Sequence, residues 1–246
     1  MATSIVSEII AHRGAGQGFA QPGTPPENTL PAFLYAWSRD VDADAAEVDV
    51  HLTRDGEIVA IHDETTERTA GAPWRVAERT LAELRTLDAG SWKGARFAGI
   101  RLPTLEEVLA TVPVGKRLYT EIKCGPEIVD RLARVVRASG LAAWQVPVIS
   151  FDFDAIRAAK QAMPEHECYL LVESEIAVET VEQAGLDGID FFYECSPGLA
   201  GRLRARGLKS VAWTVNEAEI ARRLLADGVG GITTDLPRQM RAWLVG

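Results

Sequence analysis

Eight short apolar segments, rich in β-branched residues, recur along the chain and alternate with amphipathic segments. The apolar segments are residues 8–12, 45–52, 117–123, 145–150, 167–172, 188–192, 209–215 and 230–233. Segments with helical periodicity are residues 29–39, 104–111, 126–139, 153–163, 175–184, 196–206, 217–227 and 236–244. This alternation is typical of βα units built around a parallel sheet.

Eight strands and eight helices in alternation predict a closed (β/α)8 TIM barrel, with an open doubly wound sheet as the alternative. The length of 246 residues favours the barrel, because about 250 residues is typical of that fold. We therefore expect residues 1–246 to form a single barrel domain.

A longer segment, residues 64–102, separates the second predicted strand from the third. It contains two stretches with glycine and tryptophan, residues 71–74 and 87–92. Loops of this length in compact domains are usually functional or disordered. The aromatic and glycine content favours a packed insertion that caps the barrel mouth.

The second predicted strand places acidic residues on one face. Glu47, Asp49 and His51 alternate with valines, and side chains two positions apart on a strand point to the same side. A turn and a short apolar run then bring His62 and Asp63 back towards this face. An ordinary hairpin with a solvated face is the alternative interpretation.

Other polar residues stand at predicted strand ends, where the active sites of (β/α)8 barrels lie. They are His12, Arg13, Glu121, Lys123, Trp213, Asn216 and Asp235. The sequence His12-Arg13-Gly14 puts a cation and a small residue where a phosphate could approach the backbone.

Three carboxylates, those of Glu47, Asp49 and Glu121, should converge from two adjacent strands. They could form salt bridges with Arg13 and Lys123 without any metal. A hard divalent cation is the favoured interpretation, because carboxylate oxygens suit Mg²⁺ or Ca²⁺ better than Zn²⁺.

Three other residues have simpler interpretations. His51 is expected to have a structural role beside the acidic residues. His166 lies in a polar loop and is expected to be solvated. Trp213 could pack in the core, but its place at a strand end favours a wall of the substrate pocket.

Composition narrows the possible partners. The net charge of −9, without a long block of like charge, argues against nucleic acid. Three cysteines without paired spacing indicate neither a disulfide framework nor a thiolate zinc site. With no signal-like N-terminus and no long apolar run, we expect a cytoplasmic protein without stable membrane association. The oligomeric state stays open.

Several of these segments together resemble the glycerophosphodiester phosphodiesterase family. The matching stretches are residues 11–14, 26–29, 47–56, 61–63, 68–69, 102–107, 121–123, 150–151, 213–216 and 234–237. They span nearly the whole chain in the family's order.

The resemblance implies a (β/α)8 barrel with a small insertion after the second strand. It implies hydrolysis of glycerophosphodiesters to glycerol 3-phosphate and an alcohol, with a divalent metal. By the same resemblance His12 and His62 are the general acid and base, and Arg13 and Lys123 contact phosphate. Glu47, Asp49 and Glu121 are the metal ligands, and Glu27 and Asn28 match a motif with a partly structural role.

One departure from the family pattern lies at residues 15–25, where the loop is longer and rich in Gly, Gln and Pro. Because this loop borders the barrel mouth, substrate preference is the property that it would change.

The sequence leaves two alternative functions. A phospholipase D-like enzyme acting on lysophospholipids would need an apolar groove and a membrane-binding surface, and no basic amphipathic helix suits this. A non-catalytic barrel that serves as a binding module would be expected to have lost some of the acids or imidazoles, and all of them are present.

Overall fold

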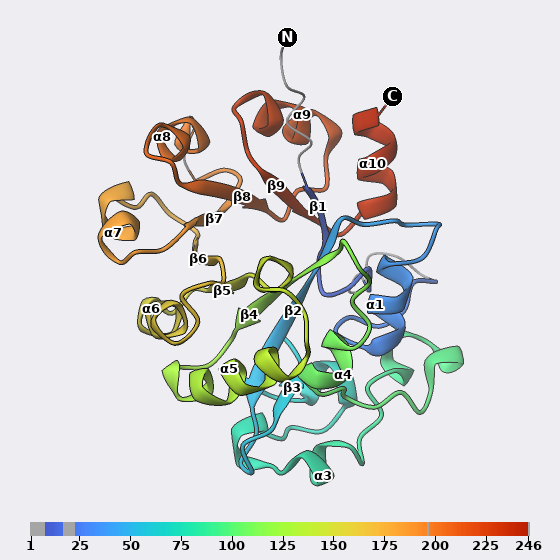
Figure 1. The fold of residues 1–246 in the computed structure, drawn as a ribbon. Helices are drawn as coiled ribbons and strands as arrows, with labels where there is room; N and C mark the ends of the chain where they lie inside the picture. Colours follow the sequence, from blue (N-terminus) through green and yellow to red (C-terminus); the bar gives the residue numbers. More distant parts are fainter. Residues whose placement is uncertain (1–7, 17–22, 196, 246) are drawn as a thin grey trace.

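A computed structural model describes residues 8–16, 23–195 and 197–245 (Figure 1). Part of the predicted long loop, residues 17–22, lies outside the described residues.

Eight parallel strands form a closed barrel, as the sequence predicts. They are β1 (Glu8–Ala11), β2 (Ala45–Leu52), β4 (Arg117–Ile122), β5 (Val148–Ser150), β6 (Cys168–Val172), β7 (Gly188–Phe192), β8 (Lys209–Trp213) and β9 (Gly231–Thr234). Each strand pairs with its neighbours in chain order, and β1 closes the ring by pairing with both β2 and β9. The prediction of a (β/α)8 barrel is confirmed.

A ninth strand, β3 (Ile58–Ala60), pairs antiparallel with the end of β2. The connecting turn contains Gly56, whose φ of 80° lies in the left-handed region that favours glycine. The expected hairpin therefore exists, and it extends β2 beyond the barrel.

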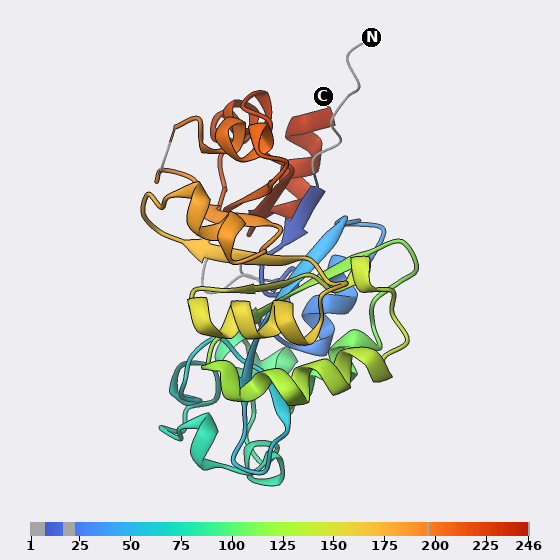
Figure 2. The same cartoon turned by 60° about the vertical axis from the view of Figure 1, so that its left-hand side comes forward.

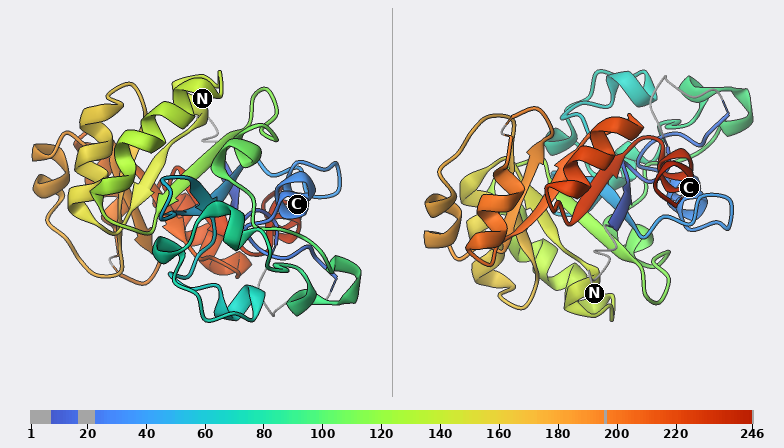
Figure 3. Two further views of the ribbon diagram at one scale, coloured as in Figure 1. Left: turned by 90° about the horizontal axis from the view of Figure 1, so that it is seen from below. Right: turned by 90° about the horizontal axis from the view of Figure 1, so that it is seen from above.

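Helices cover the outside of the strands (Figures 1 and 3). They are α1 (Leu30–Ala36), α4 (Leu105–Leu109), α5 (Val129–Ala138), α6 (Phe153–Ala162), α7 (Val178–Gln183), α8 (Leu199–Ala205), α9 (Ala218–Ala226) and α10 (Pro237–Val245). Residues 126–128 form a 3₁₀ turn before α5. No helix among the described residues is long and apolar enough to cross a membrane.

The segment between β3 and α4 contains short helices: α2 (Glu67–Ala70), α3 (Leu81–Leu84) and three 3₁₀ turns. Figure 2 shows it as a lobe below the strands. Thr80 caps α3 by accepting a hydrogen bond from the Glu83 amide. A small apolar cluster that includes Val59, Val76 and Leu84 packs this lobe against β3. Its role as a cap stays a prediction.

Apolar side chains pack on both faces of the barrel sheet, in an outer and an inner layer. The larger lies between the barrel and the helices and includes Phe33, Leu118 and Ile156. The smaller lies inside the barrel, where Tyr119 and Tyr169 are its bulkiest members. Successive side chains on a strand point to opposite faces, so alternate positions of each strand contribute to the outer and to the inner layer.

A polar network lies among the residues at the N-terminal ends of β1, β4 and β6. Arg117 pairs with Glu8 at 3.0 Å and with Glu167 at 2.6 Å. Tyr119 donates to Glu8 at 2.6 Å, and Tyr169 donates to Glu167. Burial opposes ionisation of Glu167, but hydrogen bonds from Lys209, Tyr169 and Arg117 outweigh it and lower its pKa to about 2.

We expect Glu167→Gln to destabilise the protein by about 1–3 kcal/mol at neutral pH, because the charge-assisted hydrogen bonds are lost. The folded-state pKa lies below the ordinary value of 4.5. The contribution of Glu167 is therefore complete above about 4.5 and is lost as the pH falls towards about 2. Urea unfolding across this range measures it.

The matched control is Glu182→Gln, a substitution at a carboxylate that is 48% exposed. We expect it to change stability by less than about 0.5 kcal/mol. A difference between wild type and Glu167→Gln that does not shrink on acidification would contradict the assigned ionic role.

Candidate active site

A cavity of about 340 Å³ lies at the C-terminal ends of the strands. Its lining combines acids, bases and imidazoles with an apolar wall: His12, Arg13, Glu47, His62, Glu121, Lys123, Ile149, Phe151, Leu171, Glu173, Asp190, Trp213, Thr214 and Thr233. A ligand cavity typically occupies about 300–1,000 Å³, so the site is large enough for a small molecule.

The three predicted carboxylates come together. Glu47 and Asp49 point inward from β2, and Glu121 is the register partner of Asp49 on β4. One oxygen from each lies within 4.8 Å of the others, and all three residues are buried. Glu47 Oε1 has no hydrogen-bond partner among the described residues. A buried carboxylate oxygen without a partner is costly, so the donor set fits a cation that binds oxygen ligands.

Their ionisation follows from this crowding. Burial and the charges of Asp49 and Glu121 hold the pKa of Glu47 well above its usual range. Burial and Asp49 likewise raise the pKa of Glu121. Burial also opposes ionisation of Asp49, but the Arg13, His62 and Lys123 charges outweigh it and lower its pKa. Without a cation, Asp49 is thus the member that retains its charge most readily.

Two residues in the left-handed region hold the acids in place. Arg13 has φ 54° and Asn28 has φ 53°, an uncommon conformation for residues other than glycine. The Asn28 amide donates to the Arg13 carbonyl at 3.0 Å. The Arg13 amide donates to Glu47 at 2.7 Å, and Asn28 Nδ2 donates to Asp49 at 2.7 Å. The strained backbone conformation at these two residues positions the donors that hold the Glu47 and Asp49 carboxylates.

Two cations border the acidic triad. Lys123 Nζ lies 2.7 Å from Glu121 Oε1 and 3.7 Å from Asp49 Oδ1. Arg13 donates to Glu27 at 2.8 Å, and its Nε lies 3.4 Å from Asp49. Salt bridges from both cations, the alternative to a metal, therefore exist, but they leave Glu47 Oε1 unpaired.

His12 and His62 each have an aspartate behind the ring. His12 Nδ1 lies 2.8 Å from Asp235, whose carboxylate also accepts from Asn216 at 2.7 Å. His62 Nδ1 lies 2.7 Å from Asp63. A carboxylate at Nδ1 favours a proton on that nitrogen, so Nε2 of each ring is the nitrogen that can exchange a proton.

Arg68 from the insertion supports His62. It donates to Asp63 at 2.7 Å and to Glu27 at 2.7 Å. Burial opposes ionisation of Asp63, but the hydrogen bonds from Arg68 and His62 lower its pKa to about 2. Asp63 therefore stays charged near neutral pH and holds the His62 ring.

The other two histidines lie elsewhere. His51 bonds through Nε2 to the His62 carbonyl at 3.1 Å, in agreement with the structural role expected for it. The prediction that His166 is solvated was wrong. It is buried, 4% exposed, because its loop packs against the segment between α5 and β5, where its Nδ1 lies 2.9 Å from the Val146 carbonyl.

Aromatic side chains form one wall of the cavity. Trp213 packs edge-on against Phe151, with ring centroids 5.5 Å apart, and tilted against Phe192 at 5.6 Å. Lys123 Nζ lies 5.7 Å from the Phe151 ring centre. Trp213 therefore lines the cavity rather than packing wholly in the core.

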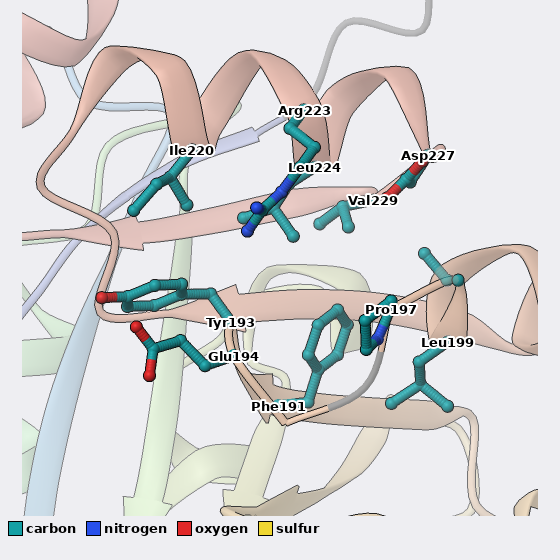
Figure 4. A pocket seen from close by; sticks show the side chains of 12 residues that line it. Phe191, Tyr193, Glu194, Pro197, Leu199, Ile220, Arg223, Leu224, Asp227 and Val229 are labelled. Carbon is teal, nitrogen blue, oxygen red and sulfur yellow. The ribbon is translucent and has the colours of Figure 1, made fainter.

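A second pocket, of about 330 Å³, lies outside the barrel near α8 and α9. Figure 4 shows side chains of α9 on one side, and those of β7 and the segment after it on the other. Phe191, Leu199 and Leu224 line it, with Arg223 and Asp227. Neither the acidic triad nor an imidazole borders this pocket.

Two acidic residues of the cavity lining, Asp190 and Glu173, were not predicted from the sequence. Asp190 lies in the middle of β7, buried at 2% exposure, and points into the barrel. A carboxylate within the apolar stretch Gly188–Phe192 is the signal that could have identified it.

Comparison with known proteins gives a consistent result. Residues 12–239 match the sequence model of the Glycerophosphoryl diester phosphodiesterase family. A glycerophosphodiester phosphodiesterase of Caldanaerobacter subterraneus is 34% identical over 243 residues, 94% of this chain and 95% of that protein.

Solved structures are also similar. A phosphodiesterase of Oleispira antarctica, in complex with the product sn-glycerol-3-phosphate, has a TM-score of 0.88 at 27% identity, covering 97% of both chains. A glycerophosphodiester phosphodiesterase of Agrobacterium tumefaciens has a TM-score of 0.80 at 27% identity, covering 96% of this chain and 99% of that one.

We expect Glu47→Gln to stabilise the protein in chelator at about pH 8, by about 1–2 kcal/mol, because it removes a carboxyl whose ionisation the buried acidic cluster opposes. The raised pKa of Glu47 sets the sign. Its contribution to stability is present below the ordinary value of 4.5 and is lost as the pH rises through the folded-state pKa. Chemical unfolding measures the difference.

Added Mg²⁺ or Ca²⁺ should reverse the order, because a ligand at 100 times its Kd stabilises by about 2.7 kcal/mol. Wild type should gain this stabilisation from the added cation, and Glu47→Gln should gain much less. The control is Glu219→Gln, at a carboxylate 88% exposed, which should respond as wild type does. Equal stabilisation of Glu47→Gln and wild type would rule out Glu47 as a ligand.

Proposed function

The chain belongs to the glycerophosphoryl diester phosphodiesterase family, and we propose how its barrel mouth hydrolyses glycerophosphodiesters. The products are glycerol 3-phosphate and an alcohol. A relative with the same fold is described with sn-glycerol-3-phosphate as product, which supports a small phosphodiester as substrate. The family and the enzyme class predicted from the sequence are confirmed.

The observation that carries the proposal is the content of one cavity. Two imidazoles, two cations and two of the three clustered carboxylates line the same 340 Å³ space. Cleavage of a phosphodiester needs charge neutralisation at phosphate, a base for the attacking oxygen and an acid for the leaving alcohol. This chain provides side chains for each of these needs.

The acidic triad would hold Mg²⁺ or Ca²⁺, which are hard cations that prefer oxygen ligands. Glu47, Asp49 and Glu121 are the proposed ligands, and Glu47 Oε1 is the atom that most needs a partner. When bound, such a cation supplies Lewis-acid stabilisation of negative charge on the phosphate oxygens.

Arg13 and Lys123 would bind the non-bridging phosphate oxygens. The carboxylates of Glu27 and Glu121 orient them, at 2.8 and 2.7 Å. Cations fixed in a partly buried cavity stabilise a more highly charged transition state without reorganising. The negative charge of the triad would be neutralised by a bound divalent cation. Arg13 and Lys123 would then be held less tightly by these carboxylates and would be more available to the phosphate.

His12 and His62 are the proposed acid and base. Burial lowers the pKa of His62, and the Arg13 and Lys123 cations lower it further. The neutral ring is thus favoured near neutral pH, which suits the role of base. His62 Nε2, which lies 3.2 Å from Lys123 Nζ, would take the proton of an attacking hydroxyl, either of water or of the glycerol itself. Attack by the glycerol hydroxyl would give a cyclic phosphate, which water would then open to glycerol 3-phosphate. His12 would give its proton to the departing alkoxide as the phosphorus–oxygen bond breaks.

A substrate panel tests the function. We expect turnover of glycerophosphocholine, glycerophosphoethanolamine and glycerophosphoglycerol, with release of glycerol 3-phosphate and loss of activity in chelator. Lysophosphatidylcholine should be a poor substrate. Preference for the lysophospholipid would instead favour the phospholipase D-like alternative. No turnover, together with no calorimetric binding of Mg²⁺ or Ca²⁺, would favour a non-catalytic barrel.

Removal of either imidazole should strongly reduce turnover. We expect His12→Ala and His62→Ala to lower kcat by about 10²- to 10⁴-fold, the usual contribution of one general acid or base. The matched control is His166→Asn, far from the cavity lining, which should keep kcat per folded molecule. Near-wild-type kcat in folded His62→Ala would remove His62 from the mechanism.

A further inference from the structure

Asp190 is a buried acid that the proposed mechanism does not use. It lies at the centre of β7, in register with Leu171 on β6 and Val211 on β8. It lines the cavity, is 2% exposed, and its Oδ1 has no hydrogen-bond partner among the described residues. A buried polar atom without a partner is uncommon and costly.

The fold itself makes no use of this carboxyl. Its neighbours inside the barrel are Leu171, Val211 and Trp213, all members of the inner apolar cluster or packed against it. Trp213 donates its indole N–H to the Asp190 backbone carbonyl at 3.3 Å, not to the side chain. A leucine would suit this surrounding better, which points to a function outside folding.

The position relative to the triad limits what Asp190 can contact. Arg13 and Lys123, the groups proposed to bind phosphate, lie just beyond β1 and β4, whereas β7 lies across the barrel. Both share one cavity with Asp190. A phosphodiester whose phosphate is held by Arg13 and Lys123 would therefore have room to extend one of its two halves towards Asp190.

We propose that Asp190 is a specificity-determining residue that hydrogen-bonds a hydroxyl of the glycerol half of the substrate. This rests on the proposed function. The glycerol half is the same in every glycerophosphodiester, which suits a buried, fixed contact. The other alcohol varies and must leave, which suits the mouth, where Phe151 is 43% exposed.

The Asp190 carboxyl and a glycerol hydroxyl are complementary in hydrogen bonding. Burial and the charge of Glu121 hold the pKa of Asp190 well above its usual range. A protonated carboxyl donates one hydrogen bond and accepts others, and a hydroxyl does the same. A ligand with an alkyl chain in place of the glycerol would leave Oδ1 unsatisfied and should bind less tightly.

The test compares two ligands that differ only in hydroxyls: glycerol 3-phosphate and n-propyl phosphate. Their affinities are measured by calorimetry on the Mg²⁺-loaded protein. We expect wild type to prefer glycerol 3-phosphate by about 10-fold or more, since one hydrogen bond in a buried site contributes about this factor. Asp190→Leu should bring the two affinities close to equal, mainly by weakening glycerol 3-phosphate.

Two further measurements separate recognition from structure. Asp190→Leu should raise Tm, because an unpaired buried carboxyl is removed. The isosteric Asp190→Asn should fold as wild type does and lose part of the preference. Asp227→Asn, at the pocket outside the barrel, should change neither the preference nor Tm.

The inference is overturned if folded Asp190→Leu and Asp190→Asn both keep the wild-type preference, or if both variants lose affinity for the two ligands equally. A lower Tm in both variants would also overturn it, because the carboxyl would then be structural. The proposed function fails on a different result, namely a wild-type protein that hydrolyses no glycerophosphodiester.

Discussion

Mutual repulsion among three buried carboxylates is the constraint on which the barrel mouth depends. Glu47, Asp49 and Glu121 converge because they are inward-facing positions on neighbouring parallel strands. Such a cluster is stable only with counter-charges or a cation. The surrounding structure meets that need in part, through Lys123 and through the side chain and backbone amide of Arg13. The unpaired Glu47 oxygen marks the part that it leaves to a ligand.

Carboxylates outside the triad link distant segments at this end of the barrel. Arg68 in the insertion and Arg13 after β1 share the buried Glu27. Through Asp63, Arg68 also orients His62, while Asp235 after β9 orients His12. Each reacting group is thus fixed by a second side chain that is itself fixed, which is the arrangement that precise catalytic geometry requires.

The two ends of the barrel use buried charge differently. At the N-terminal end, Arg117 forms salt bridges with Glu8 and Glu167, so the buried charges there are paired with one another. At the C-terminal end, Glu47 and Asp190 keep oxygens without partners among the described residues. The groups there are arranged for a ligand and not for one another, an arrangement that generally costs stability. This division agrees with the general rule for (β/α)8 barrels, in which chemistry sits at the strand C-termini.

The amino-acid sequence alone is enough to predict the barrel, its strands and the acidic triad, because the period of two along a strand and the order of βα units can be read from the chain. It also placed His12 and His62 at strand ends. The three-dimensional arrangement sets which partners these groups have: Arg68 reaches Glu27 across 41 positions, and His12 reaches Asp235 across 223. It also decided that His166 is buried and that Asp190 faces the cavity. Burial and long-range contacts depend on how the ring of strands closes, and short stretches of sequence do not specify this closure.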